Sequence, residues 1–412
     1  MVTLSQSSKD ASLECIERRE AIWPPFFLSL NSHFVAIITL LSVLCLIPPA
    51  FAQSPISGFN PATLIDRADG VFLDARTFWA DNALPLQAIF LDKGWEGPFR
   101  PEDTNNLDIF WKTDAGIIYR GWRLAGFYRG ELFLEANRDT VEILRMINLK
   151  QELPVGRTFD IDLRARGFSA KGIELSRGFR IEGSGFGNGL TFGFAARYMR
   201  GEKIQEGTIK GTAISIASKT YDFDLQLDYV YDKNFVYKRR DTVPGTGDGY
   251  SFDIGMKYDF NDSLSAELLF RDIMGRIYWK DVPYTTVDAT SATKYFDKDG
   301  YMAFRPTIRG YEAYKDFTQK IPLKTDLIVT YKKYPFILSP TVNFIENRPL
   351  YWIDIGFKAS PELSFDLGYN FNYKSLLMGV AYKKALLKIY TNDINLNKAM
   401  ALGLNLSLMY EW

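Results

Sequence analysis

The sequence has almost no cysteine or histidine. Cys15, Cys45 and His33 are the only such residues, and all three lie in the first 50 positions. A chain that loses this region keeps neither residue type, so no disulfide framework can hold it together. Histidine is the most frequent general base near neutral pH and the commonest metal ligand. We therefore expect a protein that is not an enzyme and has no catalytic residue, cofactor or metal site.

The sequence also lacks an excess of charge of either sign, because 49 basic side chains balance 49 acidic ones. A nucleic-acid-binding protein would normally show a clustered basic excess, so we expect no nucleic-acid partner. Beyond residue 52, no apolar run is long enough to form a membrane helix. Membrane association of the remaining chain would have to use strands.

The first 52 residues have the pattern of a secretory signal peptide with a long N-terminal region. Residues 34–47 are apolar apart from Thr39 and Ser42, two prolines follow, and residues 50–52 are the Ala-Phe-Ala expected before a cleavage site. We expect a mature chain that begins at Gln53 and is exported across the inner membrane. An uncleaved anchor is the alternative, but the run is shorter than the ~20 residues of a membrane-spanning helix.

Apolar residues recur at every second position from about residue 107 onward, which indicates strands with two different faces. Residues 221–232, 250–260 and 364–373 are the clearest examples. Soluble strands are typically ~5 to 6 residues long, whereas these runs reach the ~10 that cross a bilayer at a tilt. Aromatic residues near many strand ends suit the two membrane interfaces. We predict an all-β protein, a transmembrane antiparallel β-barrel of about 14 strands (range roughly 12 to 16) in the outer membrane.

The C-terminal strand alternates strictly and ends in an aromatic residue. This pattern resembles the assembly signal of Gram-negative outer-membrane β-barrel proteins, which implies contact with outer-membrane lipid and with the barrel assembly machinery. An ordinary edge strand is the alternative, although a bare hydrophobic edge would invite aggregation in a soluble protein. The residues on the apolar face are Leu402, Leu404, Leu406, Leu408, Tyr410 and Trp412.

Residues 58–65 read GFNPATLI and precede a strand-like run over 70–79. This resembles the hatch motif of the long-chain fatty-acid transporter (FadL-like) family, in which an Asn-Pro-Ala segment lies inside the barrel ahead of the first strand. The resemblance implies a fourteen-stranded barrel that carries hydrophobic compounds inward. It also implies that Asn60, Pro61 and Ala62 lie in the lumen as part of a plug. A proline-containing turn before an ordinary strand is an equal alternative.

These patterns divide the chain into three parts. We predict a signal peptide over 1–52, a plug or periplasmic segment over 53–106 that can include the first strand, and the transmembrane barrel over 107–412. The segment 53–106 is rich enough in Trp, Phe and Leu either to plug the barrel or to dock a periplasmic partner. The sequence leaves that choice open.

The predicted inner face carries many charges of both signs. They either line a water-filled lumen or pair across it and close it, and their even balance predicts no ion selectivity. The candidate lumen residues are Asp160, Asp162, Arg164, Arg166, Arg180, Arg197, Asp253, Lys257, Glu267 and Arg271.

Connections should alternate between tight periplasmic turns and longer outer loops. Residues 261–262, 334–335 and 360–362 suit tight turns, whereas 233–248, 282–300 and 310–320 suit long loops. The basic residues 238–240 fall in one such loop, where lipopolysaccharide phosphates could neutralise them, although a solvated charge run is the simpler explanation. Neighbouring strands of a barrel alternate in direction. The directions counted forward through residues 263–309 disagree with those counted back from the C-terminal strand unless residues 276–282 form a strand themselves.

A pore or transporter for a small, hydrophobic solute is the function that these features favour. The alternative is a barrel that transports nothing and serves as a scaffold or as a component of an export or surface-polysaccharide machine. An outer-membrane hydrolase is disfavoured, because the mature chain has no histidine to act as its base.

Overall fold

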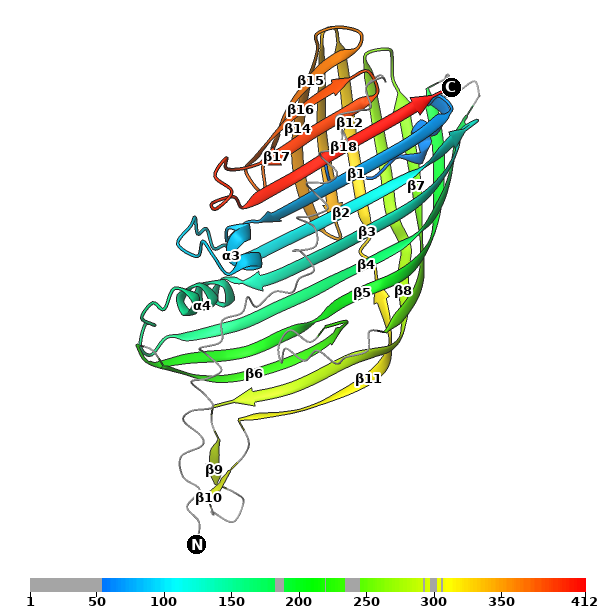
Figure 1. The fold of residues 1–412 in the computed structure, drawn as a ribbon. Coiled ribbons are helices and arrows are strands. Elements are labelled where there is room, and N and C mark those ends of the chain that lie inside the picture. The colour runs from blue at the N-terminus through cyan, green and yellow to red at the C-terminus, as the bar shows by residue number, and fades with distance from the viewer. Residues whose placement is uncertain are drawn as a thin grey trace.

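The computed structural model describes residues 54–181, 189–218, 220–233, 245–291, 293–296, 302–304 and 307–412. The predicted signal peptide and the basic residues 238–240 lie outside these ranges. The described chain forms one large antiparallel sheet that closes on itself where β18 pairs with β1 (Figure 1). The predicted all-β barrel is thereby confirmed.

The wall of the barrel is 14 strands wide, as predicted, although 16 separate strands build it. The strands β6 and β7 lie end to end between β5 and β8, and β11 and β12 lie end to end along β8. The wall strands are β1 (Gly70–Asp81), β2 (Thr104–Tyr119), β3 (Trp122–Asn137), β4 (Thr158–Arg180), β5 (Leu190–Ala217), β6 (Thr220–Tyr231), β7 (Thr246–Asp259), β8 (Leu264–Thr290), β11 (Ile308–Lys320), β12 (Lys324–Lys333), β13 (Phe336–Ile345), β14 (Arg348–Lys358), β15 (Leu363–Asn370), β16 (Ser375–Tyr382), β17 (Ala385–Thr391) and β18 (Ala401–Glu411).

The two rims of the barrel differ. One rim, which we call the turn rim, holds Gly70 and Trp412 and the tight turns at 120–121, 261–262, 334–335 and 383–384. The opposite rim, the loop rim, carries the connections that contain α3 (Leu86–Leu91), α4 (Arg138–Asn148) and the short hairpin β9 (Lys294–Phe296) and β10 (Met302–Phe304). None of the helices in the described ranges is both long and apolar enough to cross a membrane.

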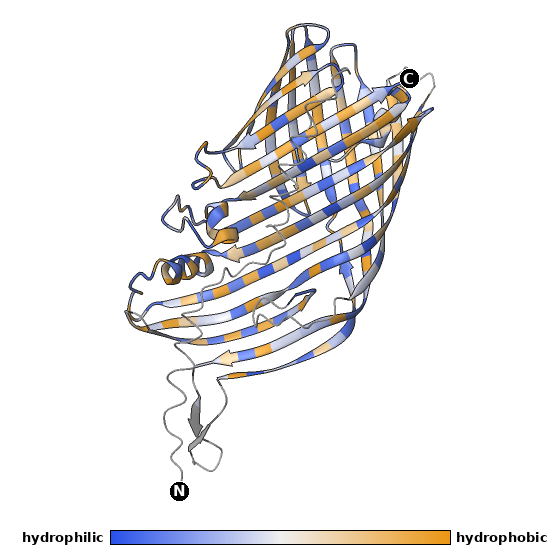
Figure 2. Ribbon diagram, in the orientation of Figure 1, coloured by the Kyte–Doolittle hydropathy of each residue, from blue (hydrophilic) through white to orange (hydrophobic). Residues whose placement is uncertain are grey.

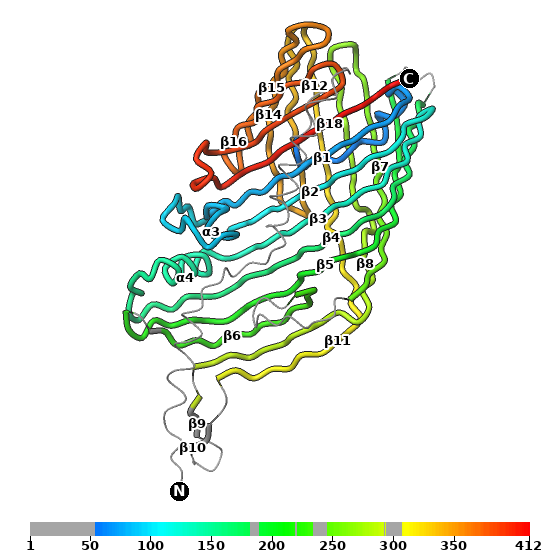
Figure 3. Tube along the Cα trace, viewed as in Figure 1, coloured from blue at the N-terminus to red at the C-terminus, as the bar shows by residue number. Residues whose placement is uncertain are grey.

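The wall is much taller on one side than on the other. Strand β5 has 28 residues and β17 has 7. At ~3.3 Å per residue, β5 is about 90 Å long, whereas ~10 residues suffice to cross a bilayer. The strands β4, β5, β6, β8 and β11 therefore extend far beyond the rest of the wall at the loop rim (Figure 3).

Two of the predicted loops were wrong, because these residues form strands on the tall side of the wall. Residues 282–290 belong to β8, and 310–320 belong to β11. Nearly all of β11 is exposed on both faces, so its sequence has no apolar alternation to mark a strand. Because β8 runs without a break from Leu264 to Thr290, it also removes the disagreement in strand direction.

Hydrophobic and hydrophilic residues alternate along many of the wall strands, as the sequence indicates (Figure 2). In β7, Phe252 and Ile254 are exposed on the outer face, whereas Ser251 and Asp253 are buried inside. In β18, Leu402 and Tyr410 face outward and Asn405 faces inward. The outer surface is thus apolar over most strands, and the polar side chains face the lumen.

Candidate functional site: a filled lumen and an apolar outer cavity

Residues 54–66, which we call the N-terminal segment, lie inside the barrel and run from the end of β13 that is farther from the turn rim toward the turn rim. Ser54 Oγ donates a hydrogen bond of 2.9 Å to Asn343 on β13. The second half of the segment is the 3₁₀ helix η2 (Pro61–Asp66), which packs against β4, β5 and β7 on the other side of the lumen. The remaining part of the predicted segment 53–106 holds β1, α3 and the start of β2, all of which belong to the wall or pack on it.

Asn60, Pro61 and Ala62 are buried in the lumen. Asn60 begins η2, because its Oδ1 accepts a 3.0 Å hydrogen bond from Ala62 N. Its Nδ2 donates to Glu267 of β8 at 3.0 Å. A Cβ atom at Gly255 of β7 would lie 1.9 Å from Asn60 Oδ1, so the wall must have glycine where the segment touches it.

The charged residues predicted to face the lumen lie at different levels between the turn rim and the loop rim. Near the turn rim, Arg180 and Lys257 bind Asp66 of η2 at 2.5 and 2.8 Å. Farther toward the loop rim, Arg166 forms an ion pair with Glu346. Between these levels lie the other predicted residues with partners inside the barrel, namely Arg197, Asp253, Glu267 and Arg271.

Asp160, Asp162 and Arg164 lie on the same face of β4 as the inner residues but outside the enclosed lumen. They are on the tall extension of β4, where Asp160 and Arg164 are exposed and Asp162 is half-exposed. Asp162 is 3.5 Å from Lys210 of the neighbouring β5. These three residues line an open face near the loop rim because β4 continues past the level at which the barrel is enclosed.

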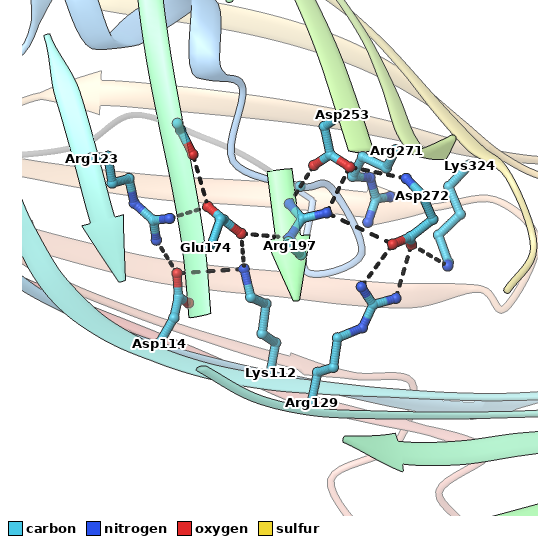
Figure 4. Close-up of polar contacts among 12 residues, drawn as sticks. Lys112, Asp114, Arg123, Arg129, Glu174, Arg197, Asp253, Arg271, Asp272 and Lys324 are labelled. Atoms are coloured by element: carbon cyan, nitrogen blue, oxygen red, sulfur yellow. Dashed lines mark hydrogen bonds and ion pairs between the residues drawn. The ribbon is translucent and has the colours of Figure 1, made fainter. Parts of the chain in front are cut away.

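Twelve charged side chains form an ion cluster across the middle of the lumen, most of which Figure 4 shows. Six are basic and six are acidic, so the cluster is neutral. They come from seven consecutive strands of the wall, β2, β3, β4, β5, β7, β8 and β12. The members are Lys112, Asp114, Arg123, Arg129, Glu131, Glu174, Arg197, Asp253, Arg271, Asp272, Lys324 and Asp326.

Glu174 of β4 is one centre of the ion cluster. It accepts from Arg197 at 2.6 Å, lies 3.3 Å from Lys112 and pairs with Arg123. The side chains of Glu174 and Arg123 are 1% exposed, so these pairs are nearly dry. The ring of Phe59 stacks on Arg123, with the guanidinium carbon 4.7 Å from the ring centre. The N-terminal segment thereby touches the ion cluster directly.

Asp272 of β8 is the second centre. Arg129 of β3 donates to it at 2.8 Å and Lys324 of β12 at 2.9 Å. The backbone of Asp272 has a φ of 60°, a left-handed conformation that residues other than glycine rarely adopt. Arg197 also lies 3.7 Å away. Three cations therefore approach one carboxylate where the pairing of β8 with β7 is irregular.

Apolar side chains fill the lumen between the ion cluster and the loop rim. On one side, Trp279 of β8 packs with Phe168 of β4 and with neighbouring apolar residues. On the other side, Phe78 of β1 makes edge-to-face contacts with Trp352 and Tyr390, at ring-centre distances of 5.4 and 6.3 Å. The segment, the ion cluster and the apolar layers together fill the lumen.

The described chain has a large apolar cavity on the outer face of the wall, with a volume of about 320 Å³. It lies on the outer face of β2–β6, beneath α4 and the loop that carries α3. Figure 1 shows these two helices at the loop-rim ends of the neighbouring strands. The apolar side chains around it include Trp111, Leu132, Leu134, Val141, Leu144, Leu163, Ile209 and Leu227.

Small residues form the floor of this cavity. Ala165 and Gly167 of β4 and Gly207 of β5 lie side by side on the outer face, because Ala165 is the register partner of Gly207. Polar groups gather at one end, where Gln205 donates to Asp232 at 3.0 Å. Burial raises the pKa of Asp232 above its ordinary value, against the effect of this hydrogen bond.

The sequence analysis did not predict this cavity or the helices that cover it. The outward residues of β4 and β5 have the same alternation as lipid-facing residues, so the pattern alone does not distinguish them. A signal for α4 was present, since Asn137 is a good N-cap residue and Val141 and Leu144 have helical spacing. Among the described residues, no group of three or more His, Cys, Asp or Glu side chains could hold a metal ion.

No family model matches the chain, and no curated protein sequence matches it. Solved structures similar to it include the toluene transporter TodX of Pseudomonas putida, with 9% sequence identity, coverage of 88% of this chain and 93% of that chain, and a TM-score of 0.37. A TodX deltaS2S3 mutant, a monoaromatic hydrocarbon channel, has 11% identity, coverage of 86% and 93%, and a TM-score of 0.43. The Ralstonia pickettii toluene transporter TbuX has 8% identity, coverage of 86% and 92%, and a TM-score of 0.33.

Proposed function

We propose that this protein is an outer-membrane transporter for a small hydrophobic solute and not an enzyme. The observation that carries the proposal is the apolar outer cavity, which has a volume of about 320 Å³. Ligand pockets generally range from about 300 to 1,000 Å³. A dry cavity of roughly 150 Å³ already holds benzene, so a molecule of one or two rings suits this cavity.

The proposed location rests on the outer surface of the barrel. Exposed apolar residues such as Leu367 of β15 and Ile389 of β17 face outward, which suits contact with outer-membrane lipid. In this proposal, residues 1–52 are removed after export, the barrel assembly machinery recognises Leu404, Leu406, Leu408, Tyr410 and Trp412, and lipopolysaccharide surrounds the loop rim.

The N-terminal segment is the proposed plug. Asn60, Pro61 and Ala62 hold it against β7 and β8, and Phe59 joins it to the ion cluster. Because the lumen is filled in this conformation, solute would pass only after the segment and the apolar layers move. The outer cavity would bind the solute before that step.

Filling the cavity tests the proposal. Ala165→Phe should place a ring on the cavity floor and reduce both binding of an apolar fluorescent probe, N-phenylnaphthylamine, and its uptake into liposomes that contain the protein. Ile173→Phe is the matched control, because Ile173 is on the same face of β4 but exposed outside the cavity. Equal binding and uptake by both variants and the wild type would contradict the proposed site.

The filled lumen favours a second function, a barrel that transports nothing and holds a partner. The neutral ion cluster joins seven strands and would therefore stiffen the wall. A stiff, closed barrel suits a scaffold. This function predicts that a periplasmic protein co-purifies with the full chain and is lost when residues 54–66 are deleted. It also predicts no solute flux with or without those residues.

A further inference from the structure

The inner faces of β13 to β18 contain buried polar groups that form no hydrogen bond with other protein atoms. Nine side-chain nitrogen and oxygen atoms on these six neighbouring strands are in this state. Buried polar atoms in proteins are nearly always satisfied, so such a concentration requires an explanation. We call this strip the polar lane, and it includes Thr341, Asp354, Asp366, Asn370, Lys388 and Asn405.

The charges in the middle of the polar lane do not balance as those of the ion cluster do. Lys388 Nζ lies 3.4 Å from Asp366 Oδ2, whereas neither oxygen of Asp354 has a hydrogen-bond partner. On the adjoining β1, Asp74 and Arg76 also face inward, and Arg76 donates at 2.6 Å to the carbonyl of Ser57. The middle of the polar lane itself therefore holds two carboxylates, Asp354 and Asp366, and one basic group, Lys388.

Several inward positions of the polar lane are glycine and so have no side chain. Gly356, Gly368 and Gly379 face inward on the adjoining strands β14, β15 and β16. A Cβ atom at Gly368 would lie 2.1 Å from Asp354 Oδ1, and one at Gly379 would lie 3.1 Å from Asp366 Cβ. The two carboxylates thus rest directly on bare backbone.

The first residues of the N-terminal segment close the polar lane from the lumen side. Ser54 binds Asn343 of β13, Ser57 holds Arg76, and Ile56, which is 1% exposed, packs into the apolar cluster with Phe78. Water that entered when this segment moved would satisfy the unpaired groups.

We propose that the polar lane is a permeation path for small hydrated cations, opened by movement of residues 54–66, with Asp354 and Asp366 as the residues that select cations. The proposal rests on the plug role given above, but its solute and its route differ from those of the outer cavity. Hydrated cations would pass along β13–β18 inside the barrel, whereas the apolar solute binds outside the wall.

The test is the reversal potential of the full chain in planar bilayers under a KCl gradient. Ile56→Asn adds no charge and weakens the apolar contact of the segment, so it should increase conductance and give a reversal potential near that of K⁺. Adding Asp354→Asn and Asp366→Asn should move the reversal potential toward zero. Lys388→Met should move it farther toward the K⁺ value.

Asp162→Asn is the matched control, because it removes a carboxylate from the exposed extension of β4 and should leave the reversal potential unchanged. If Ile56→Asn stays closed, a variant that lacks residues 54–66 takes its place. A closed barrel in both variants, or a reversal potential that the Asp354 and Asp366 changes do not alter, would overturn the proposal. Probe uptake is measured on the same variants, so loss of apolar transport with intact cation selectivity would contradict only the proposed function.

Discussion

The same side chain has different roles at different heights in this barrel. Arg197 and Arg164 both project from the inner face of the wall. Arg197 is buried and joins Glu174, Asp253 and Asp272, whereas Arg164 is exposed near the loop rim. Since removal of one member of a buried charge pair leaves the other uncompensated, the two positions should differ sharply in energy.

We expect Arg197→Met to lower the free energy of unfolding by about 3 to 5 kcal/mol, because Glu174 and Asp253 would lose a partner in a dry environment. Arg164→Met should change it by less than about 0.5 kcal/mol. Urea unfolding in lipid vesicles, followed by tryptophan fluorescence, measures both. Equal effects would mean that water reaches the ion cluster freely.

Helix α4 shows how an element outside the wall sets the shape of a site. Its side chains Val141 and Leu144 line the outer cavity, and its first turn depends on Asn137, whose Oδ1 accepts a 3.0 Å hydrogen bond from Thr140 N. Asn137→Ala should therefore cost about 1 kcal/mol of helix stability. We expect weaker binding of the apolar probe with little change in global unfolding.

Asn137→Ser is the control for this change, because a serine hydroxyl oxygen can accept the same hydrogen bond and places no carboxylate beside Asp160. It should bind the probe as the wild type does. Hydrogen exchange of residues 138–148 gives an independent reading, with faster exchange expected only in Asn137→Ala. Unaltered exchange in both would show that contacts with the wall, and not the cap, hold α4.

Strands whose two faces differ in environment were predictable from sequence, and a strand that is exposed on both faces was not. The alternation over 250–260 and 364–373 reflects contact with lipid on one face and the lumen on the other, and β7 and β15 lie there. Strand β11 is exposed on both faces over nearly all of its length, so its sequence gives no such pattern. The outer cavity and the ion cluster depend on which strands become neighbours, a property that periodicity along one strand does not contain.

At the scale of the whole molecule, the pairing of β1 with β18 closes the barrel. Strands β1 and β18 pair over their full length, from Gly70 with Glu411 to Ala80 with Ala401. Leu406 lies at the middle of β18 and faces outward between Ala75 of β1 and Leu387 of β17. The alternating C-terminal strand thus supplies both the last hydrogen-bonded edge and part of the lipid-facing surface.

Leu406→Arg should destabilise the assembled barrel by about 2 to 4 kcal/mol, the cost of a charge at the middle of the bilayer on the lipid face. Ile394→Arg is the matched control, because Ile394 is 96% exposed in the loop between β17 and β18 and should change stability by about 0 to 1 kcal/mol. The fraction that migrates as a folded barrel in unheated gel samples, together with urea unfolding in vesicles, measures both. A Leu406→Arg barrel as stable as Ile394→Arg would mean that the face of β18 with Leu402, Leu404, Leu406 and Leu408 does not contact hydrocarbon.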